Sequence, residues 1–210
     1  MFTRFLERFQ IQRNFSRKTS SAAGMKGRPP SFSFLNPTTR TCLETLWEIY
    51  QKEKPKKVLD LGTGSGIQAL AAAKWGAEKV LAIDFNELAV ETTLRNVLSN
   101  GESQRIEVKM GKAEDFIEEE ADLVCANIHL QVIESLLKKK AFFKKRWFIF
   151  SGVFGENAEE IERRLIQGSV EIVQRLKEKN WLTSAFHCVR KITFYLHSKS
   201  KKFKFSLNFD

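Results

Sequence analysis

The feature that most constrains this chain is a series of short, almost wholly apolar runs separated by segments with helical periodicity. The runs lie at Lys57–Leu61, Lys79–Asp84, Arg105–Met110, Asp122–Asn127 and Trp147–Val153. Strands that are apolar on both faces and alternate with helices are typical of parallel sheets covered on both sides. Because crossovers between parallel strands are right-handed, the pattern predicts a doubly wound α/β fold.

Helices are predicted before and between these strands, at Thr38–Gln51, at Ile67–Trp75, from a cap at Asn86 to Asn100-Gly101, and at Leu130–Lys140. In the helix after Asn86 we expect one buried apolar face, made of Val90, Leu94, Val97 and Leu98. We also expect a long helix or a helix pair over Glu156–Lys179, with a bend at Gly168. Trp181–Arg190 and Ile192–His197 are expected to form a closing antiparallel pair.

Positive charge is concentrated at the two ends of the chain. The formal net charge of the 210 residues is +10, but residues 1–30 carry +6, residues 190–210 carry +5, and residues 31–189 carry −1. A basic surplus often indicates nucleic-acid binding, and here only the ends offer it. We therefore expect three parts: a basic N-terminal helix and linker (1–30), a nearly neutral domain (31–197) and a basic C-terminal tail (198–210).

The N-terminal segment predicts an amphipathic helix followed by a Ser- and Gly-rich linker. Phe2, Phe5, Leu6 and Phe9 share one helical face, with Arg4 and Arg8 beside them. Three interpretations stay open: a basic docking arm, a helix that covers part of the core, and an organelle transit peptide. The expected location is cytoplasmic, with an organelle as the alternative.

Cysteine and histidine usage argues against disulfides and metal. Cys42, Cys125 and Cys188 are far apart and form no Cys-x-x-Cys pair, which favours a reducing compartment. Cys125 lies in an apolar run, so we expect a small buried hydrophobe there rather than a nucleophile. The three histidines show no metal-ligand spacing, and no metal site is expected. No apolar run approaches the roughly 20 residues of a membrane helix, so no membrane partner is expected either.

A glycine-rich loop, Gly62-Thr63-Gly64-Ser65-Gly66, follows the first strand and opens a helix. Glycines allow a tight turn and a close approach of the backbone to a ligand. The dinucleotide fingerprint has its third glycine where this chain has Ile67, and no Gly-Lys-Ser/Thr of a phosphate loop follows. The loop therefore predicts a nucleoside-type ligand without a pyrophosphate.

Asp84 ends the second strand, where a carboxylate can accept hydrogen bonds from both hydroxyls of a ribose. Ligands of doubly wound sheets bind beyond the carboxyl ends of the strands. The loops after Leu61, Asp84, Met110 and Asn127 should therefore form one site.

The segment Val58–Gly66, together with Asp84, resembles the S-adenosylmethionine site of the seven-stranded, Rossmann-like methyltransferases. The resemblance extends over about residues 55–197. It implies a mostly parallel seven-stranded sheet with a C-terminal antiparallel strand, and S-adenosyl-L-methionine as cofactor.

Two further segments narrow the resemblance. Asn36–Glu44 resembles the His-Pro-Thr-Thr-Arg-x-Cys-Leu-Glu helix start of the ribosomal protein L11 methyltransferases, and Ala126-Asn127-Ile128 resembles their Ala-Asn-Ile signature. The resemblance implies cofactor contacts at Thr39, Asp60, Gly62, Gly64, Gly66, Asp84 and Asn127. Glu114 is the candidate for the adenine amine, because Lys112, which directly follows Gly111, cannot accept that bond.

The chain also departs from that family. Asn36 stands in place of the motif histidine, and His129 stands where leucine is usual. Members of the family carry a separate N-terminal domain that holds the ribosomal protein, whereas about 30 residues precede the core here. We therefore expect an altered substrate cover around a retained cofactor site.

The implied reaction is methyl transfer from a sulfonium to nitrogen. Enzymes that methylate planar amines usually carry Asn-Pro-Pro-aromatic at the loop that reads Asn127-Ile128-His129 here, which favours an aliphatic amine of a protein: lysine or an N-terminal amine. Asn127 and His129 are the candidate catalytic residues. A ribosomal protein is the expected substrate, with ribosome or RNA contact through the basic ends. The alternatives are an RNA methyltransferase that docks through those ends and a non-catalytic cofactor-binding module.

Overall fold

The computed structural model of the chain describes residues 36–154, 160, 161, 163, 170–178, 181–188, 191–198 and 201–208. The expectations for the N-terminal helix and linker lie outside these residues. The helices are α2 (Pro37–Lys52), α3 (Ile67–Trp75), α4 (Glu87–Ser99), α5 (Ala113–Phe116), α6 (Leu130–Leu137) and the 3₁₀ turn η2 (Phe142–Lys144). Within the described ranges, every helix is too short or too polar to cross a bilayer.

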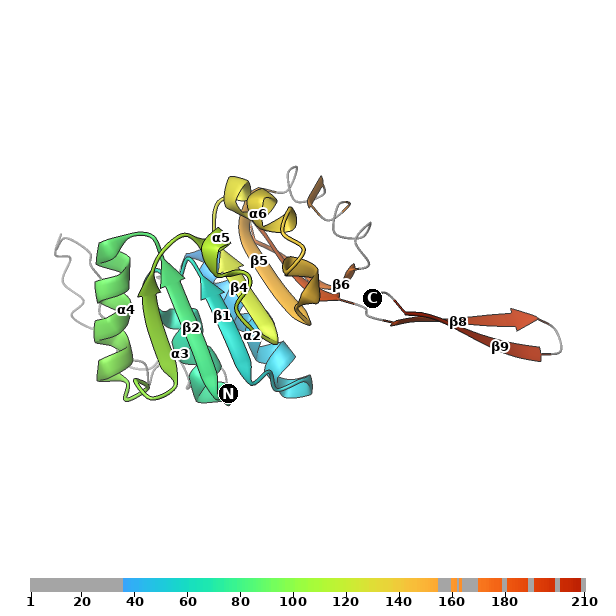
Figure 1. Cartoon of the computed structure of the whole chain (residues 1–210), viewed down its shortest axis with the longest axis horizontal. Helices are drawn as coiled ribbons and strands as arrows, with labels where there is room; N and C mark the ends of the chain where they lie inside the picture. Colours follow the sequence, from blue (N-terminus) through green and yellow to red (C-terminus); the bar gives the residue numbers. More distant parts are fainter. Residues whose placement is uncertain are drawn as a thin grey trace, which may run out of the picture.

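A seven-stranded sheet forms the centre of the molecule (Figure 1). Its strands are β1 (Lys57–Leu61), β2 (Lys79–Asp84), β3 (Ile106–Met110), β4 (Leu123–Asn127), β5 (Trp147–Phe154), β6 (Val170–Glu178) and β7 (Trp181–Cys188). They are ordered β3-β2-β1-β4-β5-β7-β6. The first five are parallel, and β7 and β6 are antiparallel, which confirms the predicted doubly wound sheet. The strand order reverses between β1 and β4, so the ligand crevice is expected there.

Two apolar clusters cover the two faces of the sheet. One contains the buried side chains of α2 and α3 with Val97 of α4, and the other contains those of α6 with Ile117 and Phe142. A strand in the middle contributes to both, as Val58 and Leu59 of β1 do. Burial on both faces explains why these strands read as near-continuous apolar runs.

The cysteines belong to this core. Cys42, Cys125 and Cys188 are free and buried, as predicted for Cys125. Burial raises the pKa of the Cys42 thiol to about 12 and also raises the pKa of Cys125. Both thiols are therefore protonated at neutral pH, where they act as small apolar side chains.

The prediction of a helix or helix pair over Glu156–Lys179 is wrong from residue 170 onward, where the structure has β6. Along β6, more buried and more exposed residues alternate, beginning with buried Val170, exposed Glu171 and half-buried Ile172. That period of two is the pattern of a strand with one covered face. The charged residues of this segment, which would also suit a helix, lie on the exposed side of the strand. Pairing with β7 is therefore what makes the segment a strand.

The predicted pairing of the last two strands is also wrong. β7 pairs with β5 and β6, whereas β8 (Lys191–Ser198) pairs with β9 (Lys201–Asn208) in a separate two-stranded sheet. This hairpin extends away from the main body (Figure 1). Strand β9 lies in the segment predicted as a basic tail, and the predicted domain boundaries themselves stay a prediction.

The burial expected for α4 is reversed at two positions. Leu94 and Leu98 are 49% and 74% exposed, while Thr93 and Asn96 are fully buried. Val97 is buried as expected. Thr93 and Asn96 point inward because they meet the backbone of the glycine loop, whereas Val97 packs into the apolar core.

Candidate functional site

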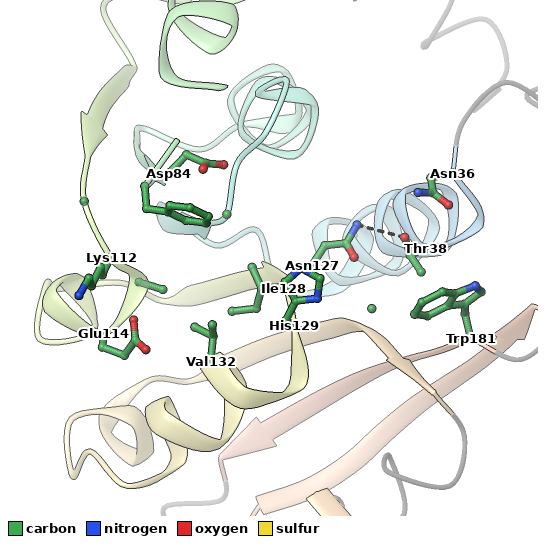
Figure 2. A pocket seen from close by; sticks show the side chains of 15 residues that line it. Asn36, Thr38, Asp84, Lys112, Glu114, Asn127, Ile128, His129, Val132 and Trp181 are labelled. Atoms are coloured by element: carbon green, nitrogen blue, oxygen red, sulfur yellow. Dashed lines mark hydrogen bonds between the residues drawn. The ribbon is translucent and has the colours of Figure 1, made fainter. Parts of the chain in front are cut away.

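A cavity of about 600 Å³ lies beyond the carboxyl ends of the central strands, a size common for small-ligand sites. Its two ends differ in chemistry (Figure 2). The Asp84 end is lined by Gly62, Asp84, Phe85, Lys112 and Glu114. The Asn127 end is lined by Asn36, Thr38, Asn127, His129, Gly152 and Trp181. Ile128 and Val132 lie between them.

The glycine loop forms a tight turn between β1 and α3. Gly62, Gly64 and Gly66 have φ values of 72°, 59° and 78°, in the left-handed region that glycine enters most readily. The N–H groups of Gly62 and Thr63 both donate to the carbonyl of Ile83, 2.9 Å away in each case. The loop is thereby tied to the end of β2, next to Asp84.

Asp60 lies buried beneath this loop rather than in the cavity. Its Oδ2 accepts hydrogen bonds from the Thr63 hydroxyl (2.6 Å) and the Ala69 N–H (3.2 Å), while its buried Oδ1 has no hydrogen-bond partner. Burial raises the pKa of Asp60 to about 6, against the opposing effect of these two hydrogen bonds. Asp60 therefore connects β1, the loop and α3.

Asp84 joins the loop to the cavity. Its Oδ2 accepts from the Gly64 N–H over 2.9 Å, and its Oδ1 accepts from the Asn86 N–H over 3.0 Å. A carboxylate has about four acceptor positions, so each oxygen keeps the capacity for one further donor. Both backbone bonds fix the carboxylate at the wall of the cavity.

Asn127, at the end of β4, is oriented by the start of α2. Its Nδ2 donates to the Thr38 hydroxyl over 3.3 Å and lies 3.5 Å from the Thr39 hydroxyl (Figure 2). A Cβ at Gly152 of β5 would lie 3.2 Å from Asn127 Oδ1, so this oxygen faces the glycine. The amide nitrogen is thus directed to α2, and the amide oxygen remains an acceptor in the cavity wall.

The predicted site residues divide into two groups. Gly62, Asp84, Glu114, Asn127 and His129 line the cavity. Thr39, Asp60, Gly64 and Gly66 do not, although Thr39 and Gly64 are bonded to lining residues and Asp60 is two residues from Gly62. Individual roles in binding or catalysis stay a prediction for all of them.

The lining residues that sequence reasoning missed include Thr38, Phe85, Val132, Gly152 and Trp181. Thr38 and Phe85 are direct neighbours of the predicted Thr39 and Asp84. Gly152 belongs to β5, the parallel neighbour of β4, and Trp181 belongs to β7, which pairs antiparallel with β5. A glycine within an apolar strand, as at Gly152, is the one available signal, since it often marks a bulge or a close backbone approach.

A nucleoside-type ligand fits the Asp84 end. An acidic acceptor at the wall, a glycine loop without side chains and the apolar Phe85 and Ile128 are the groups that a ribose and an adjoining base require. Within the described part of the chain, no three His, Cys, Asp or Glu side chains come together as a metal site would need.

The sheet order and the cavity at its switch point are those of the Rossmann-like methyltransferase fold. Residues 35–188 match the family described as "Ribosomal protein L11 methyltransferase (PrmA)", and the chain belongs to this family. Relatives named ribosomal protein L11 methyltransferase from Desulforamulus reducens and Bacillus subtilis are 38% and 37% identical over 150 and 155 residues. Each match covers 70% of this chain and 48% of the relative, so the chain spans about half the length of the curated relatives it matches.

Solved structures agree in fold. A ribosomal protein L11 methylase from Lactobacillus delbrueckii subsp. bulgaricus superposes with a TM-score of 0.64 and 27% identity, covering 72% of this chain and 78% of that one. A precorrin 8W decarboxylase from Methanobacterium thermoautotrophicum gives a TM-score of 0.58 at 19% identity, covering 74% and 93%. The second likeness concerns the fold alone.

Proposed function

We propose that this protein is an S-adenosyl-L-methionine-dependent methyltransferase acting on an aliphatic amine of a protein, with a ribosomal protein as substrate. The observation that carries the proposal is the two-ended cavity, with carboxylates at its Asp84 end and amide, hydroxyl and aromatic groups at its Asn127 end. Family membership supports methyl transfer, and the names of the relatives support a ribosomal protein.

The Asp84 end would hold the nucleoside part of the cofactor. Asp84 would accept from the ribose hydroxyls, and Glu114 would accept from the adenine amine. When bound, S-adenosylmethionine supplies an electrophilic methyl group on a positively charged sulfur. The protein's task is to bring an amine lone pair into line with that group in a site that excludes water.

The Asn127 end would receive the amine. A lysine amine has an ordinary pKa of about 10.4 and must lose a proton before it can attack, which desolvation favours. Asn127 Oδ1 would accept an N–H of the neutral amine and turn its lone pair toward the methyl group, while Thr38 holds the Asn127 amide. Both carboxylates that line the cavity lie at its other end. The proton of the amine would therefore pass to water or to His129.

Trp181 would form one wall of the acceptor end. It lines the cavity on the same side as Thr38 and Asn36 (Figure 2). A tryptophan face can pack on the methylene chain of lysine and attract its cationic, methylated products. A tryptophan face can stack on a nucleobase as well, so it is the names of the relatives that make the RNA-methylating alternative the weaker one.

Mass spectrometry of the products would test this function. The purified protein is incubated with S-adenosylmethionine and either intact ribosomal proteins or ribosomal RNA. We expect mass increments of one or more methyl groups on amine positions of a protein, and their loss in Asn127→Ala. Methylation confined to RNA would contradict the proposal, and absence of cofactor binding by calorimetry would leave only a non-catalytic module.

The β8–β9 hairpin supports a further part of the proposal, contact with the ribosome. Its register brings Ile192 opposite Leu207, Phe194 opposite Phe205 and Leu196 opposite Phe203. The two strands of the hairpin also contain Lys191, Lys202 and Lys204. A basic segment of this kind suits ribosomal RNA phosphates.

Co-sedimentation with ribosomes would test this contact at two salt concentrations. Replacing Lys191, Lys202 and Lys204 by serine should weaken binding and flatten its salt dependence. The matched control replaces the exposed Lys138, Lys139 and Lys140 by serine, which removes the same charge. Equal losses in both triple variants would mean that only net charge matters and would refute a docking hairpin.

The three buried thiols fit a reducing location such as the cytoplasm, which we include in the proposal.

A further inference from the structure

Helix α4 turns two polar residues, Thr93 and Asn96, toward the fold and leaves three leucines exposed to solvent. Thr93 and Asn96 are fully buried, although neither is a typical core residue. Leu88, Leu94 and Leu98 of the same helix are 63%, 49% and 74% exposed. Burying two polar side chains has a cost unless both are hydrogen-bonded, so their partners explain why they are there.

Both partners are carbonyls of the glycine loop. The Thr93 hydroxyl donates to the Gly64 carbonyl over 3.0 Å, and Asn96 Nδ2 donates to the Ser65 carbonyl over 2.8 Å. Residues three apart lie next to each other on a helix surface, so the two donors match two consecutive acceptors. A third contact is steric, since a Cβ at Gly66 would lie only 2.8 Å from Thr93 Cγ2.

The loop needs such donors because of its own conformation. Its left-handed glycines turn the chain away from both the strand and the helix, so the carbonyls of Gly64 and Ser65 do not enter a backbone ladder. An unpaired buried carbonyl is costly. At Gly64 the peptide is held on both sides, with its N–H bonded to Asp84 and its carbonyl bonded to Thr93.

We infer that Thr93 and Asn96 are positioning residues for cofactor binding, which set the conformation of the glycine loop from α4. This inference rests on the proposed function, because it assigns the loop to the cofactor. Neither residue lines the cavity, so both act through the backbone of Gly64 and Ser65. Because the Gly64 N–H is bonded to Asp84, these two bonds also link α4 to Asp84 through the loop. The loop and the carboxylate are thereby held in one fixed relative position.

Isosteric variants of the full chain separate positioning from packing. Thr93→Val keeps the shape and removes the donor, and Thr93→Ser restores the donor. The matched control is Thr92→Val, because Thr92 is also buried but its hydroxyl donates to Leu88 within α4. Asn96→Ala removes the second donor. Calorimetry with S-adenosylhomocysteine, hydrogen exchange of the loop amides in the free protein and the thermal midpoint are measured for each.

We expect Thr93→Val and Asn96→Ala to weaken S-adenosylhomocysteine binding by about tenfold and to speed exchange of the loop amides. Thr93→Ser and Thr92→Val should change binding by less than about twofold. If Thr93→Val lowers the thermal midpoint as Thr92→Val does but leaves binding and loop exchange unchanged, the two residues are only structural. If the wild-type protein binds no S-adenosylhomocysteine, the proposed function fails and the inference fails with it, whatever the exchange data.

Discussion

Gly152 of β5 lies so close to Ile128 that a Cβ on the glycine would be 2.9 Å from the Ile128 carbonyl oxygen. The contact joins the bulged part of β5 to the loop that directly follows Asn127, the last residue of β4. Gly152 also has a φ of 84°, which L side chains rarely adopt. The position of the Asn127 loop therefore depends on a glycine in the neighbouring strand.

Gly152→Ala should destabilise the protein through both strain and collision. Left-handed strain alone costs about 1–2 kcal/mol for alanine, and displacing the Ile128 carbonyl adds to it. Gly101→Ala is the control for strain, because Gly101 has a φ of 70° with open space around its Cβ position. In urea unfolding, Gly152→Ala should lose more stability than Gly101→Ala, and only Gly152→Ala should reduce activity. Equal losses would show that the Ile128 contact yields easily.

Removal of the Asp84 carboxylate should weaken cofactor binding. Asp84→Ala takes away the predicted ribose acceptor and leaves the N–H groups of Gly64 and Asn86 without their partner. We expect about 1.5–3 kcal/mol of lost binding free energy, measured by calorimetry with S-adenosylhomocysteine. Asp84→Asn should lie between the alanine variant and the wild type. Glu87→Gln is a control for charge, because exposed Glu87 does not line the cavity. Unchanged affinity in Asp84→Ala would exclude the ribose role.

Asp60 should make the stability of the protein depend on pH. Burial raises its pKa from 3.8 to about 6, so the folded state holds this proton more tightly than the unfolded state does. The stabilising contribution of protonated Asp60 is therefore complete below about pH 4 and is lost as the pH rises through about 6. Asp60→Asn cannot lose a proton there. Relative to the wild type, it should gain about 1 kcal/mol of unfolding free energy between about pH 5 and about pH 7.5.

Urea unfolding of both proteins at the two pH values measures this gain. Groups common to both proteins cancel in the difference, which isolates position 60. A difference that stays constant between the two pH values would show that the carboxyl titrates at its ordinary pKa.

A buried chain of hydroxyls should stabilise the contact between α2 and the antiparallel strands. The Thr183 hydroxyl of β7 lies 2.6 Å from the Thr41 hydroxyl of α2 and 2.6 Å from the Ser151 hydroxyl of β5. Thr183→Val should cost about 1–3 kcal/mol of unfolding free energy, because it leaves buried hydroxyls without this partner. Thr45→Val is the contrasting variant, since the buried Thr45 hydroxyl has no hydrogen-bond partner. It should be neutral or slightly stabilising, and chemical denaturation that ranks the two variants the other way would disprove this account.

Much of the central fold follows from local sequence pattern. The predicted and observed bounds agree at β1, α3 and β2, where apolar strands and glycine-terminated helices alternate. The Asn86 cap is also confirmed, because its side chain accepts from the N–H groups of Leu88 and Ala89. The cavity-lining positions of Asp84 and Asn127 follow equally, since residues at the ends of parallel strands meet at one edge of the sheet.

Residues brought in from distant elements were beyond that reasoning. Trp181 lines the cavity because β7 joins the sheet beside β5, and Gly152 lines it because β5 pairs with β4. Thr93 and Asn96 of α4 point inward because they meet loop carbonyls, which no helical periodicity reveals. Val170–Glu178 is a strand because it pairs with β7, although its charges also suit a helix.

The sequence by itself determined the class of fold, the glycine loop and the acidic residue at the end of β2, because short-range periodicity and turn chemistry record which segments are buried on both faces. The tertiary structure alone decided which threonine of α2 accepts a hydrogen bond from Asn127 and which glycine leaves room for the loop after Asn127. It also decided which side of α4 is hydrogen-bonded to the glycine loop. Those outcomes depend on contacts between residues far apart in the chain, whose distances are set by strand pairing and packing rather than by local preference.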